Sequence, residues 1–121
     1  MKRLAIVDDS AADRFLIELM VEDRFHVDVY PDAASAIAGI QLTRPDAVLS
    51  DIELPGMRGT ELLGRLREVA QGVPVIAFTG HSSALDKARL LKAGFDGYVS
   101  KPVLSDEQLF DEIGRVMDAA G

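Results

Sequence analysis

The feature that most constrains the fold of this chain is a fivefold alternation of short aliphatic segments with longer stretches of helical periodicity. The segments are apolar on both faces, as in LAIV at residues 4–7, which is typical of strands in a parallel sheet covered by helices on both sides. We predict strands at residues 4–7, 27–30, 47–49, 73–78 and 97–99. The element order is therefore βα repeated five times, and the fold class is α/β.

Helix signals occupy the intervals between these segments. The first helix has Ser10 or Asp13 as a candidate N-cap, and the second, residues 33–43, stops before a proline. Gly72 and Gly94 are expected to end the third and fourth helices in a left-handed conformation. The apolar faces comprise Phe15, Leu16, Leu19 and Met20 in the first helix, Leu62, Leu63, Leu66 and Val69 in the third, Leu85, Ala88, Leu91 and Ala93 in the fourth, and Leu109, Phe110, Ile113, Val116 and Met117 in the fifth.

Composition narrows the function classes. A chain of 121 residues that is 48% hydrophobic and 27% charged suits one ordered domain. The net charge of −7 without a basic run disfavours nucleic acid as a partner, and the absence of Cys excludes disulfides and thiolate catalysis. Apolar runs are too short for a membrane span and no signal peptide is visible. We expect a cytoplasmic single domain, residues 1–121, with no effector domain after Gly121.

Polar side chains follow four of the five predicted strands. Asp8 and Asp9 end the first strand, Asp51 the third, Thr79 the fourth and Lys101 the fifth. Because ligands bind at the carboxyl ends of the strands in an open parallel sheet, we expect these side chains to gather there. Carboxylates held a few ångströms apart need a compensating cation. Oxygen ligands without His or Cys favour Mg²⁺, with Mn²⁺ as the alternative, and thereby phosphoryl chemistry.

A carboxylate can itself accept a phosphoryl group and form an acyl phosphate. Asp51 is the best candidate for this nucleophile, because it ends the third strand just before a Pro-Gly turn. Asp8 and Asp9 would hold the metal. Lys101 would pair with Asp51 or with a phosphoryl oxygen, and Thr79 would donate a hydrogen bond to another oxygen.

The order and spacing of these residues resemble the response-regulator receiver domain, the phosphoacceptor module of two-component signalling, over essentially the whole chain. The motifs that carry the resemblance are VDDS at residues 7–10, DIELPGMRG at 51–59, Thr79, AGFDGY at 93–98 and KP at 101–102. The resemblance implies a five-stranded, doubly wound (βα)5 parallel sheet of flavodoxin-like order 2-1-3-4-5, in a single domain similar to chemotaxis regulators.

The resemblance also implies a ligand set and a phosphodonor. Asp51 would be phosphorylated by a histidine kinase or a phosphotransfer protein. Asp9 and Asp51 would ligate Mg²⁺ directly together with the backbone carbonyl of Glu53, and Asp8 would act mostly through water. Such a domain is a switch more than an enzyme, because it catalyses only its own phosphorylation from small acyl phosphates and its own dephosphorylation.

Further implied roles concern the switch and its output. Thr79 and Tyr98 match the family's switch pair, and Lys101 matches its ammonium group, with a cis bond between Lys101 and the proline that follows. The output would be another protein that docks on the face formed by the fourth helix, the fifth strand and the fifth helix, around Leu90, Tyr98 and Leu104. A phosphorylation-dependent dimer is a further outcome that this family allows, whereas nucleic acid and membrane are not expected as partners.

Three residues depart from the usual pattern. Gly80 follows Thr79 where the family usually has Ala, which loosens that loop. Glu53 and His81 lie two residues after the acceptor and two after the hydroxyl, where side chains tune the lifetime of the phosphoryl group. Since a carboxylate beside a dianion is unfavourable, we hypothesise that Glu53 tightens metal affinity and slows phosphorylation.

Other interpretations stay open at the level of sequence. A phosphatase of the haloacid-dehalogenase type also uses an Asp nucleophile, Mg²⁺, a Thr and a Lys, but that family places the nucleophile on its first strand. A degenerate receiver that acts as a scaffold is another alternative. Individually, Asp8 and Asp9 could serve only a helix dipole, Thr79 could cap the next helix or end a strand, and Tyr98 could be a half-buried strand aromatic.

Overall fold

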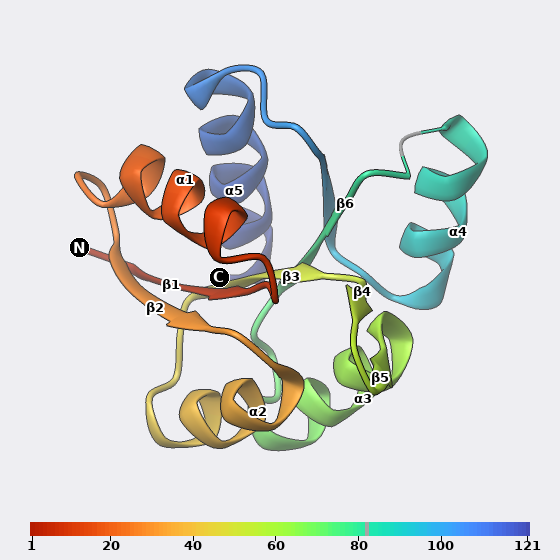
Figure 1. Ribbon diagram of the computed structural model, residues 1–121. Coiled ribbons are helices and arrows are strands. Elements are labelled where there is room, and N and C mark those ends of the chain that lie inside the picture. The colour runs from red at the N-terminus through yellow and green to blue at the C-terminus, as the bar shows by residue number, and fades with distance from the viewer. Residues whose placement is uncertain (82) are drawn as a thin grey trace.

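The central feature of the fold is a five-stranded parallel sheet of order β2-β1-β3-β6-β7 (Figure 1), seen in a computed structural model that describes residues 1–81 and 83–121. Its strands are β1 (Arg3–Val7), β2 (His26–Tyr30), β3 (Ala47–Asp51), β6 (Val75–Thr79) and β7 (Gly97–Ser100). Because β6 and β7 are the fourth and fifth strands of this sheet along the chain, the predicted order 2-1-3-4-5 is confirmed. After β2 the chain adds its next strand on the other side of β1, so the strand order reverses between β1 and β3, which creates the switch point at which such sheets bind ligands.

Among the described residues, four helices connect successive strands of the sheet and a fifth follows the last strand, and together they cover both faces of the sheet (Figure 1). They are α1 (Ala11–Val21), α2 (Ala33–Leu42), α3 (Gly59–Val69), α4 (Ala84–Ala93) and α5 (Asp106–Ala120). Side-chain oxygens cap four of them by accepting a backbone N–H three residues on; the caps are Ser10, Asp32, Ser83 and Ser105. Helices α1 and α5 lie on one side of the sheet, and α2 and α3 on the other. In the part of the chain that the structure describes, no helix is long and apolar enough to span a membrane.

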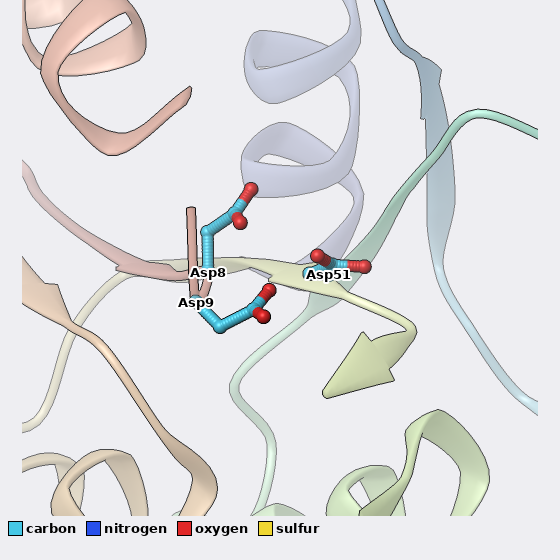
Figure 2. A group of neighbouring side chains, drawn as sticks. All are labelled: Asp8, Asp9 and Asp51. Atoms are coloured by element: carbon cyan, nitrogen blue, oxygen red, sulfur yellow. The ribbon is translucent and has the colours of Figure 1, made fainter. Parts of the chain in front are cut away.

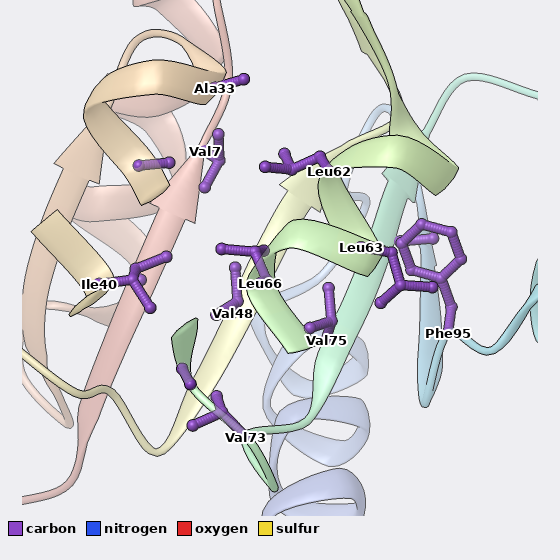
Figure 3. Close-up of a cluster of buried hydrophobic side chains, with 14 of the residues drawn as sticks. Val7, Ala33, Ile40, Val48, Leu62, Leu63, Leu66, Val73, Val75 and Phe95 are labelled. Atoms are coloured by element: carbon purple, nitrogen blue, oxygen red, sulfur yellow. The ribbon is translucent and has the colours of Figure 1, made fainter. Parts of the chain in front are cut away.

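The core has two layers, one on each face of the sheet, because successive strand residues point to opposite faces. Ala5, Val7 and Val48 face the layer under α2 and α3, part of which Figure 3 shows. Leu4 and Ile6, their neighbours on β1, face the layer under α1 and α5. Apolar side chains on both faces therefore explain the near-continuous hydrophobic strands, as predicted.

The apolar face predicted for α1 is wrong for three of its four residues, whereas the fourth, Met20, packs against the layer under α1 and α5. Phe15, Leu16 and Leu19 are each about half exposed or more, and the fully buried residues of the helix are Ile17 and Val21. The apolar residues of α1 cover more than one face, so their spacing alone did not fix which face packs on the sheet. Burial follows the stripe of Ile17 and Val21, which are four residues apart and lie in the layer under α1 and α5.

The face predicted for α4 is also wrong. All ten residues of α4 are exposed or half-buried, and Leu85 and Leu91 are among the exposed ones. Gly94 does end this helix with φ at 114°, as predicted. Helix α3 instead ends at Val69 with Ala70 as its C-cap, so Gly72, with φ at 88°, lies in the following turn.

Two smaller differences from the predictions concern β2 and the segment after β3. Strand β2 lies at the sheet edge and is only half buried, so it is not apolar on both faces. A short antiparallel pair, β4 (Glu53–Leu54) and β5 (Met57–Arg58), follows β3 and was not predicted. Its turn holds Gly56 at φ 79°, a conformation that favours glycine, and it fixes the backbone immediately after Asp51.

Candidate functional site: an acidic cluster at the sheet edge

Three carboxylates gather where β1 and β3 end (Figure 2). Asp8 and Asp9 directly follow β1, and Asp51 is the last residue of β3. Parallel pairing of these adjacent strands brings their ends to the same edge, and one carboxylate oxygen from each residue lies within 4.8 Å of the others. Asp8 and Asp51 are buried, whereas Asp9 is exposed. The predicted cluster is therefore assembled as expected, with an open side at Asp9.

This cluster fits a hard divalent cation. The buried Oδ2 of Asp8 accepts no hydrogen bond from the residues that the structure describes, although the ammonium of Lys101 lies 2.9 Å away. Burial raises the pKa of Asp8, against the opposing effects of Lys101 and of the Ser10 N–H. Three carboxylates with an incompletely satisfied oxygen form a donor set suited to Mg²⁺, which prefers oxygen ligands.

Lys101 supplies the positive charge of the site. Its Nζ lies 2.9 Å from Asp8 Oδ2, 3.1 Å from Asp51 Oδ2 and 3.1 Å from Asp13 Oδ2. Burial opposes the charge of this ammonium, but its close contacts with the three carboxylates outweigh burial and raise the pKa of Lys101. The ammonium also lies 4.8 Å from the centroid of the Phe78 ring, and the peptide bond to Pro102 is cis, as the resemblance implied.

Backbone N–H groups orient the two buried carboxylates. Ser10 N donates to Asp8 Oδ1 at 2.9 Å, and Glu53 N donates to Asp51 Oδ1 at 2.9 Å. The guanidinium of Arg14 donates to the backbone carbonyl of Asp8 at 2.8 Å. Each carboxylate is thus held by the turn that follows it, which leaves Oδ2 of both residues directed to Lys101.

Thr79 ends β6 beside this cluster. The preceding residue, Phe78, pairs with Asp51 across the sheet. The carbonyl of Thr79 accepts the N–H of Lys101 at 2.8 Å. The buried hydroxyl accepts the N–H of His81 at 3.0 Å. The alternative that Thr79 caps the next helix is wrong, because Ser83 caps α4.

The loop after Thr79 connects the acidic cluster with Tyr98. The imidazole of His81 contacts the carboxylate of Glu53, and the hydroxyl of Tyr98 donates to the carbonyl of His81 at 2.7 Å. Glu53 therefore turns its carboxylate to His81 and does not join the three converging carboxylates. Tyr98 is half-buried on β7, and its own N–H donates to Glu112 at 2.8 Å.

One member of the site was missed by sequence reasoning. Asp13 was considered only as a helix cap, but its carboxylate contacts Lys101. The signal available in the sequence was weak, because an acid in the first turn of a helix has an ordinary explanation in the helix dipole. The structure brings Asp8, Asp51 and Lys101 together as predicted and adds Asp13 to them.

The chain matches the family described as the response regulator receiver domain over residues 4–114. It is 37% identical to an uncharacterized 14.6 kDa protein of Leptolyngbya boryana, over 83% of this chain and 79% of that protein. It is 39% identical to the sensory transduction protein RegX3 of Mycolicibacterium smegmatis, over 88% of this chain and 47% of that protein. The chain thus spans about half the length of RegX3.

Solved structures agree with this family match. A CheY-like receiver domain protein from Methanospirillum hungatei is 32% identical, with a TM-score of 0.87 over 99% of this chain and 96% of that chain. The receiver domain of the sensor histidine kinase PA1611 from Pseudomonas aeruginosa is 27% identical, with a TM-score of 0.84 over 97% of this chain and 98% of that chain. That structure holds a magnesium ion in its active site cleft. The chain belongs to the response regulator receiver domain family.

Proposed function

We propose that this chain is a phosphorylation-dependent signalling switch in which Asp51 accepts a phosphoryl group from a histidine kinase or a phosphotransfer protein. The observation that carries the proposal is the buried Asp51 carboxylate, held by the Glu53 N–H and facing the Lys101 ammonium beside Asp8. A carboxylate in this setting is oriented, and its charge is balanced, for attack on a phosphoryl group.

The transfer step follows from this geometry. An oxygen of Asp51 attacks the phosphorus atom, a new P–O bond forms, and the P–N bond of the phosphohistidine breaks with its electron pair going to the imidazole nitrogen. With a small acyl phosphate as donor, the P–O bond to the leaving carboxylate breaks instead. Lys101 would then donate to a phosphoryl oxygen, and the Thr79 hydroxyl, which now accepts the His81 N–H, would donate to another.

Asp8, Asp9 and Asp51 would hold Mg²⁺, with Mn²⁺ as the alternative, together with the backbone carbonyl of Glu53. When bound, the ion would supply positive charge that offsets the clustered carboxylates and the phosphoryl oxygens. The magnesium ion in the cleft of the PA1611 receiver domain supports this assignment.

The proposed chemistry is limited to the chain's own phosphorylation and dephosphorylation. A phosphatase of the haloacid-dehalogenase type is not favoured, since the Asp51 candidate ends β3 and the first strand carries Asp8 and Asp9. The family match and the similar structures described above are to receiver domains and give no support to that alternative.

The output surface is proposed on the face formed by α4, β7 and α5. A groove on this face is lined by Lys87, Tyr98, Gln108 and Glu112, and Leu104, in the segment that precedes α5, is 83% exposed. The Tyr98 hydroxyl connects this face to the acidic cluster through the His81 carbonyl. Movement of Thr79 toward a phosphoryl group would release the His81 N–H and so change the contacts of Tyr98.

The proposal is tested by intact mass spectrometry after incubation with acetyl phosphate, with and without Mg²⁺. We expect one added phosphoryl group on the wild-type chain in the presence of Mg²⁺ and none on Asp51→Asn. A matched control, Asp46→Asn, removes an acid at the opposite end of β3 and should load like the wild type. An adduct on Asp51→Asn, or none on the wild type from either acetyl phosphate or a phosphorylated phosphotransfer protein, would contradict the proposal.

A further inference from the structure

We propose that Asp13 is a positioning residue of this site: its carboxylate holds the Lys101 ammonium and thereby sets how strongly Lys101 competes with a divalent cation for Asp8 and Asp51. The phosphoryl part of the inference rests on the proposed function. The cation part rests only on the geometry of the acidic cluster.

The contact itself is well defined. Lys101 Nζ donates to Asp13 Oδ2 at 3.1 Å, the same distance as to Asp51 Oδ2, and it lies 2.9 Å from Asp8 Oδ2. An ammonium has three N–H donors and here faces three carboxylates. Asp13 belongs to the first turn of α1, whereas Asp8 and Asp51 come from strand ends. The ammonium therefore links a helix to two strands, and Asp13 is its only anchor on α1 among the described residues.

Asp13 is placed to act through Lys101 and not as a metal ligand. Its carboxylate is outside the group of Asp8, Asp9 and Asp51 that converge within 4.8 Å, and its side chain is 40% exposed. An ammonium that is shared among three carboxylates neutralises each carboxylate less than an ammonium that is shared between two carboxylates. Without Asp13, the charge of Lys101 falls on Asp8 and Asp51 alone, and a cation that approaches these oxygens is opposed more strongly.

The same contact has the opposite effect on a phosphoryl group. Asp13 occupies one donor of Lys101 and adds a negative charge near an incoming dianion. Loss of this carboxylate frees the donor and removes the repulsion, so phosphorylation at saturating cation becomes faster. Opposite changes in cation affinity and phosphorylation rate are thus the signature of the positioning role. If Asp13 served only the dipole of α1, its loss would change the stability of the helix without opposite changes in cation affinity and phosphorylation rate.

The test compares Asp13→Asn with Asp13→Glu and with a matched control, Glu22→Gln. Glu22 is exposed at the C-terminal end of the same helix, about 13 Å farther along its axis, and its substitution removes the same charge. Calorimetric titration with Mg²⁺ gives the dissociation constant, and intact mass after acetyl phosphate at saturating Mg²⁺ gives the loading rate.

We expect Asp13→Asn to weaken Mg²⁺ binding about fivefold and to raise the loading rate, whereas Asp13→Glu restores wild-type behaviour and Glu22→Gln does not depart from it. Asp13→Ser serves as the second neutral variant if the Asn variant does not fold. Unchanged Mg²⁺ affinity in the neutral variant, equal weakening in Glu22→Gln, or a loading rate that falls together with affinity would overturn the inference alone. A wild-type chain that neither binds Mg²⁺ nor loads would overturn the proposed function and this inference with it.

Discussion

At the scale of single residues, two glycines distinguish the effect of packing from the effect of backbone conformation. Gly97 lies against α5, and Gly114 lies within it. A Cβ on Gly97 would lie 2.8 Å from Val116 Cγ1 and 2.9 Å from Glu112 Oε2, closer than packed atoms tolerate, whereas a Cβ on Gly114 meets open space. We expect Gly97→Ala to lower the free energy of unfolding by about 1–3 kcal/mol. Gly114→Ala, in the interior of α5, should raise it by about 0.5–1 kcal/mol. Urea denaturation of both variants measures these changes, and equal effects would contradict the packing argument.

Glu53 and His81 form an exposed pair in the loops that follow Asp51 and Thr79. The Glu53 carboxylate lies two residues after Asp51 and is contacted by His81. We expect Glu53→Gln to raise the rate of phosphorylation by acetyl phosphate about threefold, because one repelling charge is removed, and to weaken Mg²⁺ binding for the same reason. His81→Ala should slow phosphorylation, since the carboxylate loses its partner. Time courses of intact mass measure both rates, and a change in the same direction for the two variants would sink the hypothesis.

At the scale of elements, the N-caps of α4 and α5 are chemically alike but support helices of very different burial. Ser83 and Ser105 each accept a backbone N–H from the residue three positions on. Helix α5 buries Leu109 and Ile113 in the core, whereas all of α4 is exposed or half-buried. Loss of the α5 cap should therefore reduce global stability by about 1 kcal/mol.

For α4 the same substitution should act locally. Ser83→Ala is expected to speed amide hydrogen exchange within α4 with a smaller change in global stability, because few buried contacts hold this helix. Exchange measured by mass spectrometry and urea denaturation on Ser83→Ala and Ser105→Ala provide the comparison. Equal global destabilisation by the two variants would show that α4 is part of the cooperative core.

The elements also show how far sequence reasoning reached. The five strands and their parallel pairing were predictable from aliphatic runs bounded by Gly, Pro and Asp, whereas the strand order followed only from the resemblance to a known family. The buried face of α1 was not predictable, since Phe15 and Leu19 compete with Ile17 in spacing and only tertiary packing selects among them. At the site, the sequence predicted the convergence of Asp8, Asp51 and Lys101, because the ends of parallel strands meet at one edge of the sheet. Asp13 was not predicted, because its partner is 88 residues away and its position in a first helical turn has an ordinary explanation.

At the scale of the whole molecule, the buried Asp8 carboxylate lowers the stability of the folded chain at neutral pH. The pKa of Asp8 is raised above 3.8 by burial, so the folded chain favours the protonated carboxyl, and its ionisation costs stability as pH rises above that value. Asp8→Asn should therefore raise the melting temperature at pH 7 in EDTA, and the difference from the wild type should shrink as pH falls toward 3.8.

In Mg²⁺ the order of melting temperatures should reverse, so that the wild-type chain is more stable than Asp8→Asn. A cation at one hundred times its dissociation constant stabilises the folded state by about 2.7 kcal/mol, and Asp8→Asn should gain less than the wild type because it has lost a carboxylate of the cluster. Thermal unfolding in EDTA and in Mg²⁺ measures both effects. A variant that is less stable than the wild type in EDTA, or equally stabilised by Mg²⁺, would contradict the view that the site trades stability for cation binding.

The central claim is that Asp51, among four neighbouring acids, carries the phosphoryl group. Reduction with borohydride converts an acyl phosphate to the corresponding alcohol, so it marks the phosphorylated residue permanently in the peptide chain. After incubation with acetyl phosphate and Mg²⁺, peptide sequencing by mass spectrometry should find this conversion at Asp51 alone. Conversion at Asp8, Asp9 or Asp13, or no conversion in a chain that has gained phosphoryl mass, would contradict the claim.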